Sequence, residues 1–286
     1  MEMAHVHLIG IGGSGLSAIA SLLLERGEVV SGSDRQMTPA AQAIQAAGAR
    51  VMIGHRAENI AGADLVVRSS AIPETNPEVQ AAQAAGIQVF KRDGFLGNLL
   101  QGYRVIAVAG THGKTTTTAM IAWVLTRLGI DTSYIIGSNA VNLGGNAHAG
   151  KSDLFVIEAD EYDRMFLGLT PTIEVVTNLE HDHPDCYPTP ADFYQAFEAF
   201  AARLIPGGIL LACADDPGAH RLLEGVAGGQ GSARSYGLYR SPLETQPDYS
   251  ASDLERNEQG GTTFSVSLCE GQGIGEGAHA KSVVTM

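Results

Sequence analysis

Basic residues are scarce in this chain of 286 residues, and lysine most of all. Lysine and arginine number 18 against 31 aspartates and glutamates, which gives a net charge of −13. Such a charge repels nucleic acids and anionic membranes unless a local basic patch overrides it, and the sequence shows no such patch. We therefore expect neither a nucleic-acid partner nor a membrane partner. Only four lysines occur, and Lys114 inside a glycine-rich loop is for that reason a candidate functional residue.

Cysteines and long apolar runs are also few. Cys186, Cys213 and Cys269 lie far apart with no C-x-x-C pair, which argues against a disulfide framework or a zinc knuckle and for a reducing compartment. No run reaches the roughly 18 apolar residues that a membrane-spanning helix needs, and the first residues lack the pattern of a secretion signal. We expect a cytoplasmic protein. A hydrophobic content of 44% over this length predicts a globular protein of two domains.

Short apolar runs alternate with alanine-rich stretches along most of the chain. HVHLIGI and EVVSGSD are typical of buried strands, and SGLSAIASLLLERG has its apolar residues at helical spacing. This alternation indicates an α/β fold in which helices cover both faces of a parallel sheet. We predict a Rossmann-like domain at 1–102 and a second α/β domain at 103–286. Beyond about residue 226 the pattern weakens; we expect GTTFSVSL to form an edge strand, and residues 269–286 show no amphipathic period.

The first glycine cluster, GIGGSG, follows a predicted strand and opens a predicted helix. Glycines in that setting let the backbone approach a diphosphate held at the helix N-terminus. Asp34 closes the next strand about 20 residues on, where an acid binds a ribose hydroxyl in dinucleotide sites. The loop alone does not separate NAD from another nucleotide with a diphosphate, and a tight turn without a ligand is a further alternative. The candidate residues of the loop are Gly10, Gly12, Gly13, Ser14 and Gly15.

The second glycine loop lies in VIAVAGTHGKTTTTAM, between an apolar run and four threonines. In such a loop the backbone N–H groups hold phosphates, the lysine neutralises the β and γ oxygens, and the next hydroxyl binds Mg²⁺. The usual spacing would place glycine where this chain has Val108, so the loop is a shorter variant. We predict ATP and Mg²⁺ as cofactors and a P-loop-type ATP-binding domain. The candidate residues are Gly110, Thr111, His112, Gly113, Lys114, Thr115 and Thr116.

Acidic residues and histidines follow two later apolar runs, in FVIEADEYD and VVTNLEHDHPD. Ligands of open α/β sheets bind at the carboxyl ends of the strands, so both clusters are expected at the same edge as Lys114. Glu158 and His183 are the main candidates, and a solvated loop is the alternative for each run taken singly. Mg²⁺ prefers oxygen, so a histidine ligand indicates a second ion or a bridging role. Asp160, Asp163, His181 and Asp185 are secondary candidates.

These motifs resemble those of the Mur ligases in order and spacing, over roughly residues 5 to 220. The resembling segments are HLIGIGGSGLSAIA, SGSD, IGH, VVRSSAI, NPEV, VAGTHGKTTTT, NLGGNA, IEADEYD and TNLEHDHPD. The resemblance implies that the first domain binds the UDP part of UDP-N-acetylmuramate, and not NAD. It implies that Asp34, His55 and Ser70 join the first glycine loop in this role. It further implies that Thr115, Glu158 and His183 hold the metals and that Asn178 lies near the nucleotide.

The resemblance also implies the reaction of an ATP-dependent ligase in peptidoglycan biosynthesis, with Lys114, Glu158 and His183 as catalytic residues. In the family a carboxylate is activated as an acyl phosphate and captured by an amine. Several relatives carry a carbamylated lysine beyond the DH motif, but this chain has no lysine between residues 152 and 280. That absence favours the member that adds L-alanine, or the recycling member that attaches a tripeptide, and GIGGSG with NLGGNA favours the former.

Family members run well past 400 residues and have a third domain. We therefore expect a C-terminally truncated chain that lacks this domain, binds nucleotide weakly and does not ligate alone. An NAD-dependent oxidoreductase would explain the first glycine loop and Asp34 but would leave the second loop unused. A nucleotide-binding module without catalysis is the other alternative. The sequence does not indicate the oligomeric state.

Overall fold

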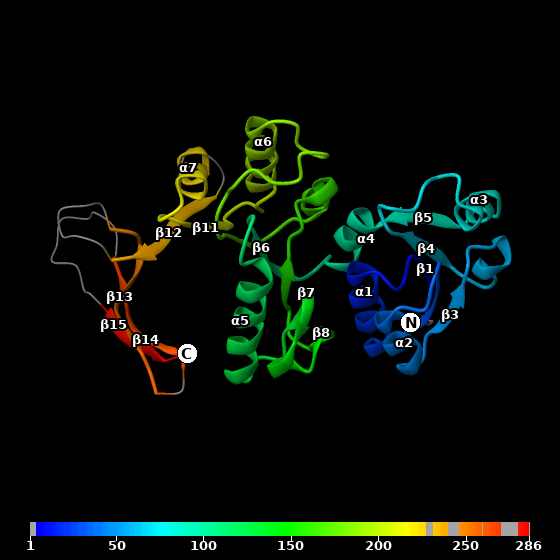
Figure 1. Ribbon diagram of the computed structural model, residues 1–286, viewed down its shortest axis with the longest axis horizontal. Coiled ribbons are helices and arrows are strands. Elements are labelled where there is room, and N and C mark those ends of the chain that lie inside the picture. The colour runs from blue at the N-terminus through cyan, green and yellow to red at the C-terminus, as the bar shows by residue number, and fades with distance from the viewer. Residues whose placement is uncertain (1–3, 227–230, 240–245, 259, 270–279, 286) are drawn as a thin grey trace. The chain divides into compact units, whose positions relative to one another are not determined.

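The structure is a computed structural model, and it describes residues 4–226, 231–239, 246–258, 260–269 and 280–285 (Figure 1). The chain divides into two compact units. The first unit is Met1–Val108 with Lys114–Thr170, and the second is Ala109–Gly113 with Pro171–Met286. Within the described ranges, no helix is both long and apolar enough to span a bilayer.

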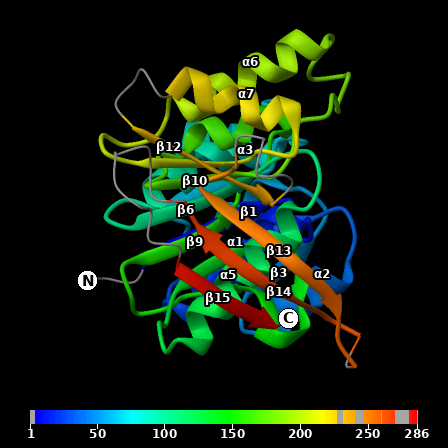
Figure 2. The ribbon, with the colours of Figure 1, turned by 90° about the vertical axis from the view of Figure 1, so that its left-hand side faces the viewer.

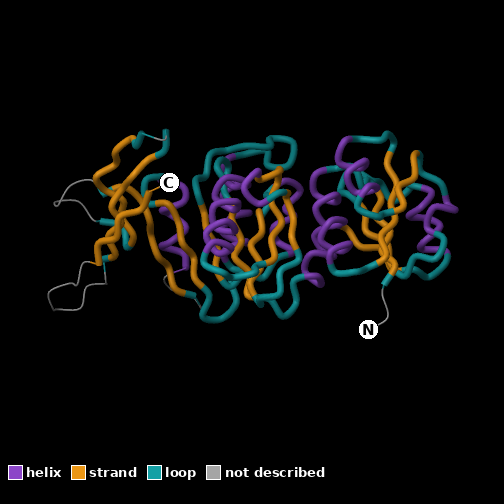
Figure 3. The backbone as a smooth tube through the Cα atoms, turned by 90° about the horizontal axis from the view of Figure 1, so that it is seen from below, coloured by secondary structure: helices purple, strands orange, loops and turns teal. Residues whose placement is uncertain are grey.

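The first unit begins with a five-stranded parallel sheet, which we call the N-terminal sheet. Its strand order is β3-β2-β1-β4-β5, with helices on both sides (Figure 3). The strands of this sheet alternate with helices along the chain, as the sequence predicts. Its strands are β1 (His5–Ile9), β2 (Val29–Asp34), β3 (Arg50–Ile53), β4 (Leu65–Arg68) and β5 (Gln88–Lys91). Its helices are α1 (Ser14–Glu25), α2 (Pro39–Ala46), the 3-10 helix η1 (Ala57–Ile60), α3 (Pro77–Ala84) and α4 (Arg92–Leu99).

Two of these helices begin with a capping side chain followed by proline. Thr38 accepts a hydrogen bond from an N–H of the first turn of α2, and Asn76 accepts two in α3. Each cap satisfies backbone donors that have no partner within the helix, and proline at the next position loses nothing because its N–H would be unused. These signals are local, which is why the sequence predicts both helices. Helix α4 was not predicted, since its sequence RDGFLGNL contains two glycines and a short apolar pattern.

The rest of the first unit is a four-stranded mixed sheet. Its order is β6-β9-β7-β8, in which β8 is antiparallel to β7 and the other pairs are parallel. Val108 of β6 pairs with Glu158 of β9, so both strands end at the same edge of the sheet. The elements are β6 (Arg104–Ala109), α5 (Lys114–Arg127), β7 (Ser133–Ala140), the 3-10 helix η2 (Val141–Leu143), β8 (Gly145–His148), β9 (Leu154–Glu158) and the 3-10 segment η3 (Tyr162–Gly168).

The second unit holds three consecutive parallel strand pairs followed by two antiparallel ones. The strand order is β10-β11-β12-β13-β14-β15, and β13 to β15 lie side by side in Figure 2. The buried rings of Tyr187, Phe193, Phe197 and Phe200 form an aromatic core at α6. The elements are β10 (Ile173–Val176), α6 (Pro190–Ala201), β11 (Ile209–Cys213), α7 (Pro217–Val226), β12 (Ser232–Leu238), β13 (Tyr249–Arg256), β14 (Thr262–Leu268) and β15 (Ala280–Thr285).

The last strands differ from the sequence prediction. The segment GTTFSVSL was expected at a sheet edge, but β14 lies between β13 and β15. Strand β15 also falls within residues 269–286, where the sequence shows no amphipathic period. The reason is that these strands form through backbone pairing with partners elsewhere in the chain, which the pattern of one segment does not reveal. Cys186, Cys213 and Cys269 are free thiols, as predicted.

Candidate functional site

The second glycine loop is held by the segment that follows β10. The His112 N–H donates to Asn178 Oδ1 at 2.9 Å, and Asn178 Nδ2 donates back to the His112 carbonyl at 3.1 Å. The Thr111 N–H donates to the Asn178 carbonyl at 2.9 Å, and the Thr177 hydroxyl donates to the His112 carbonyl at 2.6 Å. The side chain and the carbonyl of Asn178 therefore hold the backbone of the loop in place.

Gly110 shows why this loop requires glycine. Its φ of +131° lies in a region that side chains rarely adopt, and a Cβ there would collide with the Thr177 hydroxyl. Gly113, which precedes the helix, also has a positive φ, of +82°. The two glycines thus allow the loop to turn tightly against its neighbouring segment.

Lys114 opens α5 and pairs with a buried carboxylate. Its Nζ lies 2.9 Å from Glu161 Oε1, with side-chain exposures of 14% for Lys114 and 1% for Glu161. Burial raises the pKa of Glu161, and the nearby Lys114 charge opposes that rise. The pair holds the ammonium group at the start of the helix, immediately after the glycine loop.

Thr115 and Glu158, two of the predicted metal ligands, lie together. The Thr115 hydroxyl donates to Glu158 Oε1 at 2.9 Å, and the Gly137 N–H of β7 donates to Oε2 at 2.6 Å. The two hydrogen bonds fix the carboxylate at the end of β9, beside the first turn of α5. A hydroxyl and a carboxylate at this distance offer oxygen ligands to one cation.

Two secondary candidates have other roles in the structure. Asp160 pairs with Arg92 of α4 at 3.0 Å, and its other oxygen accepts the Tyr162 N–H. Asp163 has a φ of +53°, so the segment after β9 turns sharply there. The Arg92 guanidinium also occupies the space that a side chain at Gly15 would need. These contacts bring α4 and the segment after β9 to the start of α1.

His183 lies in the second unit, in a tight turn. Its φ is +54°, its ring lies 3.8 Å from the Asp182 carboxylate, and its side chain is 32% exposed. A non-glycine residue in this strained conformation is found preferentially at functional sites. His181, in contrast, bonds the Tyr187 carbonyl at 2.8 Å and packs edge-on against Phe193, which is a structural role.

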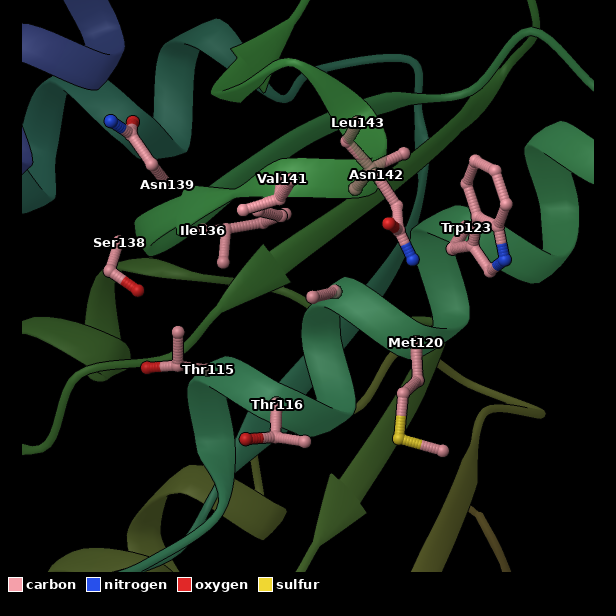
Figure 4. Close-up of a pocket in the computed structure, with 12 residues that line it drawn as sticks. Thr115, Thr116, Met120, Trp123, Ile136, Ser138, Asn139, Val141, Asn142 and Leu143 are labelled. Atoms are coloured by element: carbon pink, nitrogen blue, oxygen red, sulfur yellow. The ribbon is translucent and has the colours of Figure 1, made fainter. Parts of the chain in front are cut away.

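A pocket of about 350 Å³ opens beside Thr115 (Figure 4). It lies between the first turns of α5 and the segment that runs from β7 through η2. Met120 and Trp123 continue the helix wall beyond Thr115 and Thr116, and Ile136 faces them from β7. A volume of this size is typical of ligand pockets, which combine apolar walls with a few polar groups. The remaining lining residues are Ala119, Ser138, Asn139, Ala140, Val141, Asn142 and Leu143.

Hydrogen bonds to Asp34 and Thr38 hold the backbone of the first glycine loop. The Gly12 N–H donates to Asp34 Oδ2 at 2.9 Å, and the Thr38 hydroxyl donates to the Gly12 carbonyl at 3.0 Å. The Gly13 N–H donates to the carbonyl of Gly10 at 3.1 Å. Ser14 and Gly15 begin α1, so the loop leads directly into a helix N-terminus as predicted. Asp34 therefore lies at the loop, where its second oxygen accepts the N–H of the following residue.

The remaining predicted residues of this region lie on two other loops. His55 follows β3, and its Nδ1 is 3.0 Å from the hydroxyl of Ser33. Ser70 follows β4, and its hydroxyl contacts the sulfur of Met165 at 3.4 Å. Since β2, β3 and β4 belong to one parallel sheet, these loops and the glycine loop all follow carboxyl ends of strands of the N-terminal sheet.

Sequence reasoning did not assign three residues that shape these sites. Gly137 binds Glu158, Glu161 binds Lys114, and Glu78 binds groups around His55. Glu161 lies in the same acidic run as the predicted ligand Glu158, and Glu78 lies in the segment NPEV. Gly137 carried no signal, because its contact arises only from strand pairing.

Comparison with known proteins identifies one family along the chain. The model of the Mur ligase family, catalytic domain, matches residues 5–104, and that of the Mur ligase middle domain matches residues 108–275. A UDP-N-acetylmuramate–L-alanine ligase of Frankia casuarinae is 49% identical over 220 residues, which are 75% of this chain and 44% of that protein. The chain spans about half the length, or less, of the curated relatives it matches.

Solved structures agree with this result. A UDP-N-acetylmuramate:L-alanyl-gamma-D-glutamyl-meso-diaminopimelate ligase from Neisseria meningitides is similar with a TM-score of 0.80 and 29% identity, covering 93% of this chain and 84% of that one. A UDP-N-acetylmuramate-alanine ligase from Thermotoga maritima gives a TM-score of 0.77 and 26% identity, covering 92% and 58%. Both the N-terminal sheet and the mixed sheet are thus those of known ligases, and the chain belongs to the Mur ligase family.

Proposed function

We propose that this chain is the sugar-nucleotide-binding and ATP-binding part of a ligase that joins L-alanine to the carboxylate of UDP-N-acetylmuramate in peptidoglycan biosynthesis. The observation that carries the proposal is the hydrogen bond between Thr115 and Glu158 in a chain of the Mur ligase family. Thr115 directly follows Lys114 in the sequence. The curated relative from Frankia casuarinae is named for this reaction. We place the reaction in the cytoplasm, where ATP is available.

A carboxylate must be activated before it can form an amide bond with an amine. It does not react with an amine in water because its leaving group would be oxide, so one oxygen must first become part of a phosphate. We propose that the N-terminus of α5, immediately after the glycine loop, and the Lys114 ammonium bind the ATP phosphates and orient the γ-phosphate toward the muramate carboxylate. Positioning and charge neutralisation are the main contributions a protein makes to phosphoryl transfer.

Thr115 and Glu158 would hold Mg²⁺ in this site. Their hydroxyl and carboxylate oxygens are the ligands that Mg²⁺ prefers. Bound there, the ion would neutralise charge on the ATP phosphates. Mg²⁺ usually takes several of its ligands from water and substrate phosphates, so we expect the same here. His183, a nitrogen ligand, would serve a second ion.

The N-terminal sheet would bind the sugar nucleotide. We propose that the diphosphate binds at Gly10 to Gly15, where a glycine loop meets the N-terminus of α1. Asp34, His55 and Ser70 follow neighbouring strands and would bind the uridine and the sugar. We propose that this domain ends at residue 102. Because the relatives are about twice as long, we propose that much of the amino-acid site lies in the part of them that this chain does not cover.

A tripeptide in place of L-alanine is the second candidate for the acceptor. It is favoured by the similarity to the ligase from Neisseria meningitides, of which the chain covers 84%. The identity is 29% there, against 49% to the relative named for L-alanine. We therefore prefer L-alanine.

Calorimetric titrations of the purified chain test the proposal. We expect saturable binding of UDP-N-acetylmuramate, binding of ATP with Mg²⁺, and no binding of NADH. Thr115→Val should weaken Mg²⁺-dependent ATP binding, since it removes the hydroxyl beside Glu158. Thr126→Val is the matched control, because among the described residues its hydroxyl bonds only the Ala122 carbonyl of the same helix. Binding of NADH alone would overturn the proposal in favour of an oxidoreductase.

A further inference from the structure

The carboxylate of Glu78 is buried beside the N-terminal sheet and accepts four hydrogen bonds. Glu78 lies in the first turn of α3, and its side chain has no exposed surface. Its Oε1 accepts from the Asn59 amide and from the Arg56 backbone N–H, the latter at 3.1 Å. Its Oε2 accepts from the Ser33 hydroxyl at 2.6 Å and from His7 Nε2 at 3.3 Å.

These hydrogen bonds keep the carboxylate ionised. Burial by itself raises the pKa of Glu78, but the hydrogen bonds from His7, Ser33 and Asn59 outweigh burial and leave the pKa below its ordinary value. An ionised carboxylate accepts hydrogen bonds and donates none. Glu78 therefore dictates which of its neighbours must donate.

The direction of the next hydrogen bond follows. A serine hydroxyl has one hydrogen, and Ser33 gives it to Glu78. Ser33 Oγ is also 3.0 Å from His55 Nδ1, so there the oxygen accepts and Nδ1 donates. Glu78 Oε1 lies 3.7 Å from His55 Nδ1, and its negative charge also favours a proton on Nδ1. A neutral imidazole carries one N–H, which leaves its Nε2 as an acceptor.

The Nε2 atom of His55 is available to a ligand. The side chain is 16% exposed, and the described parts of the chain provide no hydrogen-bond partner for Nε2. Ser33 directly precedes Asp34, the acid at the first glycine loop. The relay from Glu78 through Ser33 to His55 thus ends beside the loop that we propose as the diphosphate site.

We propose that Glu78 is a positioning residue that acts through Ser33 to hold neutral His55 with its proton on Nδ1, so that Nε2 accepts a hydrogen bond from a bound uridine nucleotide. The inference rests on the proposed sugar-nucleotide function. Two groups of the nucleotide donate such a bond, the imide N–H of uracil and a ribose hydroxyl. An ionised phosphate oxygen has no hydrogen to offer, so a neutral His55 discriminates between the two ends of the nucleotide.

Glu78→Gln changes the hydrogens of the relay while keeping its shape. Asn59 and Arg56 both donate toward one side, so the amide oxygen of glutamine must face them and its NH₂ must face Ser33 and His7. Ser33 then accepts from the amide and donates to His55 Nδ1. The proton of His55 consequently moves to Nε2, which becomes a donor. His7 is expected to change tautomer in the same way.

Nitrogen-15 NMR of the histidine rings in the full chain measures this directly. His55 signals are assigned by their loss in His55→Gln. We expect Nδ1–H in the wild type, Nε2–H in Glu78→Gln, and a mixture in Ser33→Ala, which removes the relay. Ser31→Ala is the matched control, since Ser31 is buried on the same strand and contacts His5 and His7 but not His55. It should leave the His55 tautomer unchanged.

Calorimetry with UDP then tests the ligand. We expect Glu78→Gln to weaken UDP binding about tenfold, as the loss of one hydrogen bond would, while Ser31→Ala binds as the wild type does. N3-methyl-UDP, 2′-deoxy-UDP and 3′-deoxy-UDP identify the donor, and equal binding of all three and of UDP would overturn the acceptor role. A wild-type His55 with its proton on Nε2, or an unchanged tautomer in a folded Glu78→Gln, would overturn the relay. No binding of UDP to the wild type would instead overturn the proposed function, because the tautomer is measured without ligand.

Discussion

Gly137→Ala should raise the Mg²⁺ requirement of this protein by displacing Glu158. A Cβ at residue 137 would lie 2.6 Å from both carboxylate oxygens of Glu158, whereas ordinary contact begins at 3.4 Å. The carboxylate must therefore recede from β7. Its hydrogen bonds from the Gly137 N–H, at 2.6 Å, and from the Thr115 hydroxyl, at 2.9 Å, are both stretched or broken by that movement.

The size of the effect follows from these contacts. A hydrogen bond to a charged group contributes about 1.5–3 kcal/mol, and the lower value suits a carboxylate that is only partly buried. A loss of about 1.4 kcal/mol in the placement of one metal ligand corresponds to roughly a tenfold change in affinity. We expect the Mg²⁺ concentration for half-maximal ATP binding to rise by about that factor.

The assay is calorimetric ATP binding over a series of Mg²⁺ concentrations, with thermal unfolding as a check on folding. Gly145→Ala is the matched control, because it lies in the adjoining strand and its added Cβ would meet nothing closer than 3.9 Å. It should leave the Mg²⁺ dependence unchanged. If folded Gly137→Ala shows the wild-type Mg²⁺ dependence, then Glu158 is not a metal ligand in this site.

Further predictions address the nucleotide loop and the fold. Lys114→Ala should abolish ATP binding and leave UDP-N-acetylmuramate affinity unchanged in titrations, and an equal loss of both would contradict our assignment. Adding Glu161→Gln should recover thermal stability without ATP binding, because it removes the buried charge that Lys114 offsets. Gly110→Ala should lower the melting temperature more than Gly129→Ala does, since both have positive φ but only residue 110 meets a clash; equal effects would contradict this. Glu174 is fully buried and burial raises its pKa well above the ordinary value, so it binds a proton on folding and its contribution to stability falls as pH rises above about 4.5. Glu174→Gln should therefore stabilise more at pH 8 than at pH 4.5 in thermal unfolding, by at most about 1.4 kcal/mol per pH unit, and a gain independent of pH would contradict it.

The predictable part of the fold is the part encoded in local signals. The helix α3 was expected from NPEVQAAQAAG, because Asn76 caps it and Pro77 suits its first position. The strands of the N-terminal sheet were expected from short apolar runs between helices. The strands β13 and β15 were not expected, since their formation depends on hydrogen bonds to partners elsewhere in the chain.

The candidate sites divide in the same way. Lys114 and Thr115 are adjacent in a glycine-loop motif, so their proximity needs no tertiary information. Glu158 could be placed near them because strand ends of a parallel sheet share an edge, and the hydrogen bond to Thr115 agrees with that placement. The role of Asn178 was expected at the nucleotide, and the structure adds that its amide holds the loop backbone.

The sequence by itself determined the family, the alternation of strands and helices, and the two glycine loops, because these depend on residue types at short and regular spacing. The tertiary structure alone decided which groups hold the functional side chains. Gly137 reaches Glu158 only because β7 pairs with β9. Glu78 sets the tautomer of His55 only because α3 packs against the sheet. Its buried carboxylate there accepts hydrogen bonds from four donors. Such contacts join residues 19 or more positions apart, and no spacing rule within one segment can specify them.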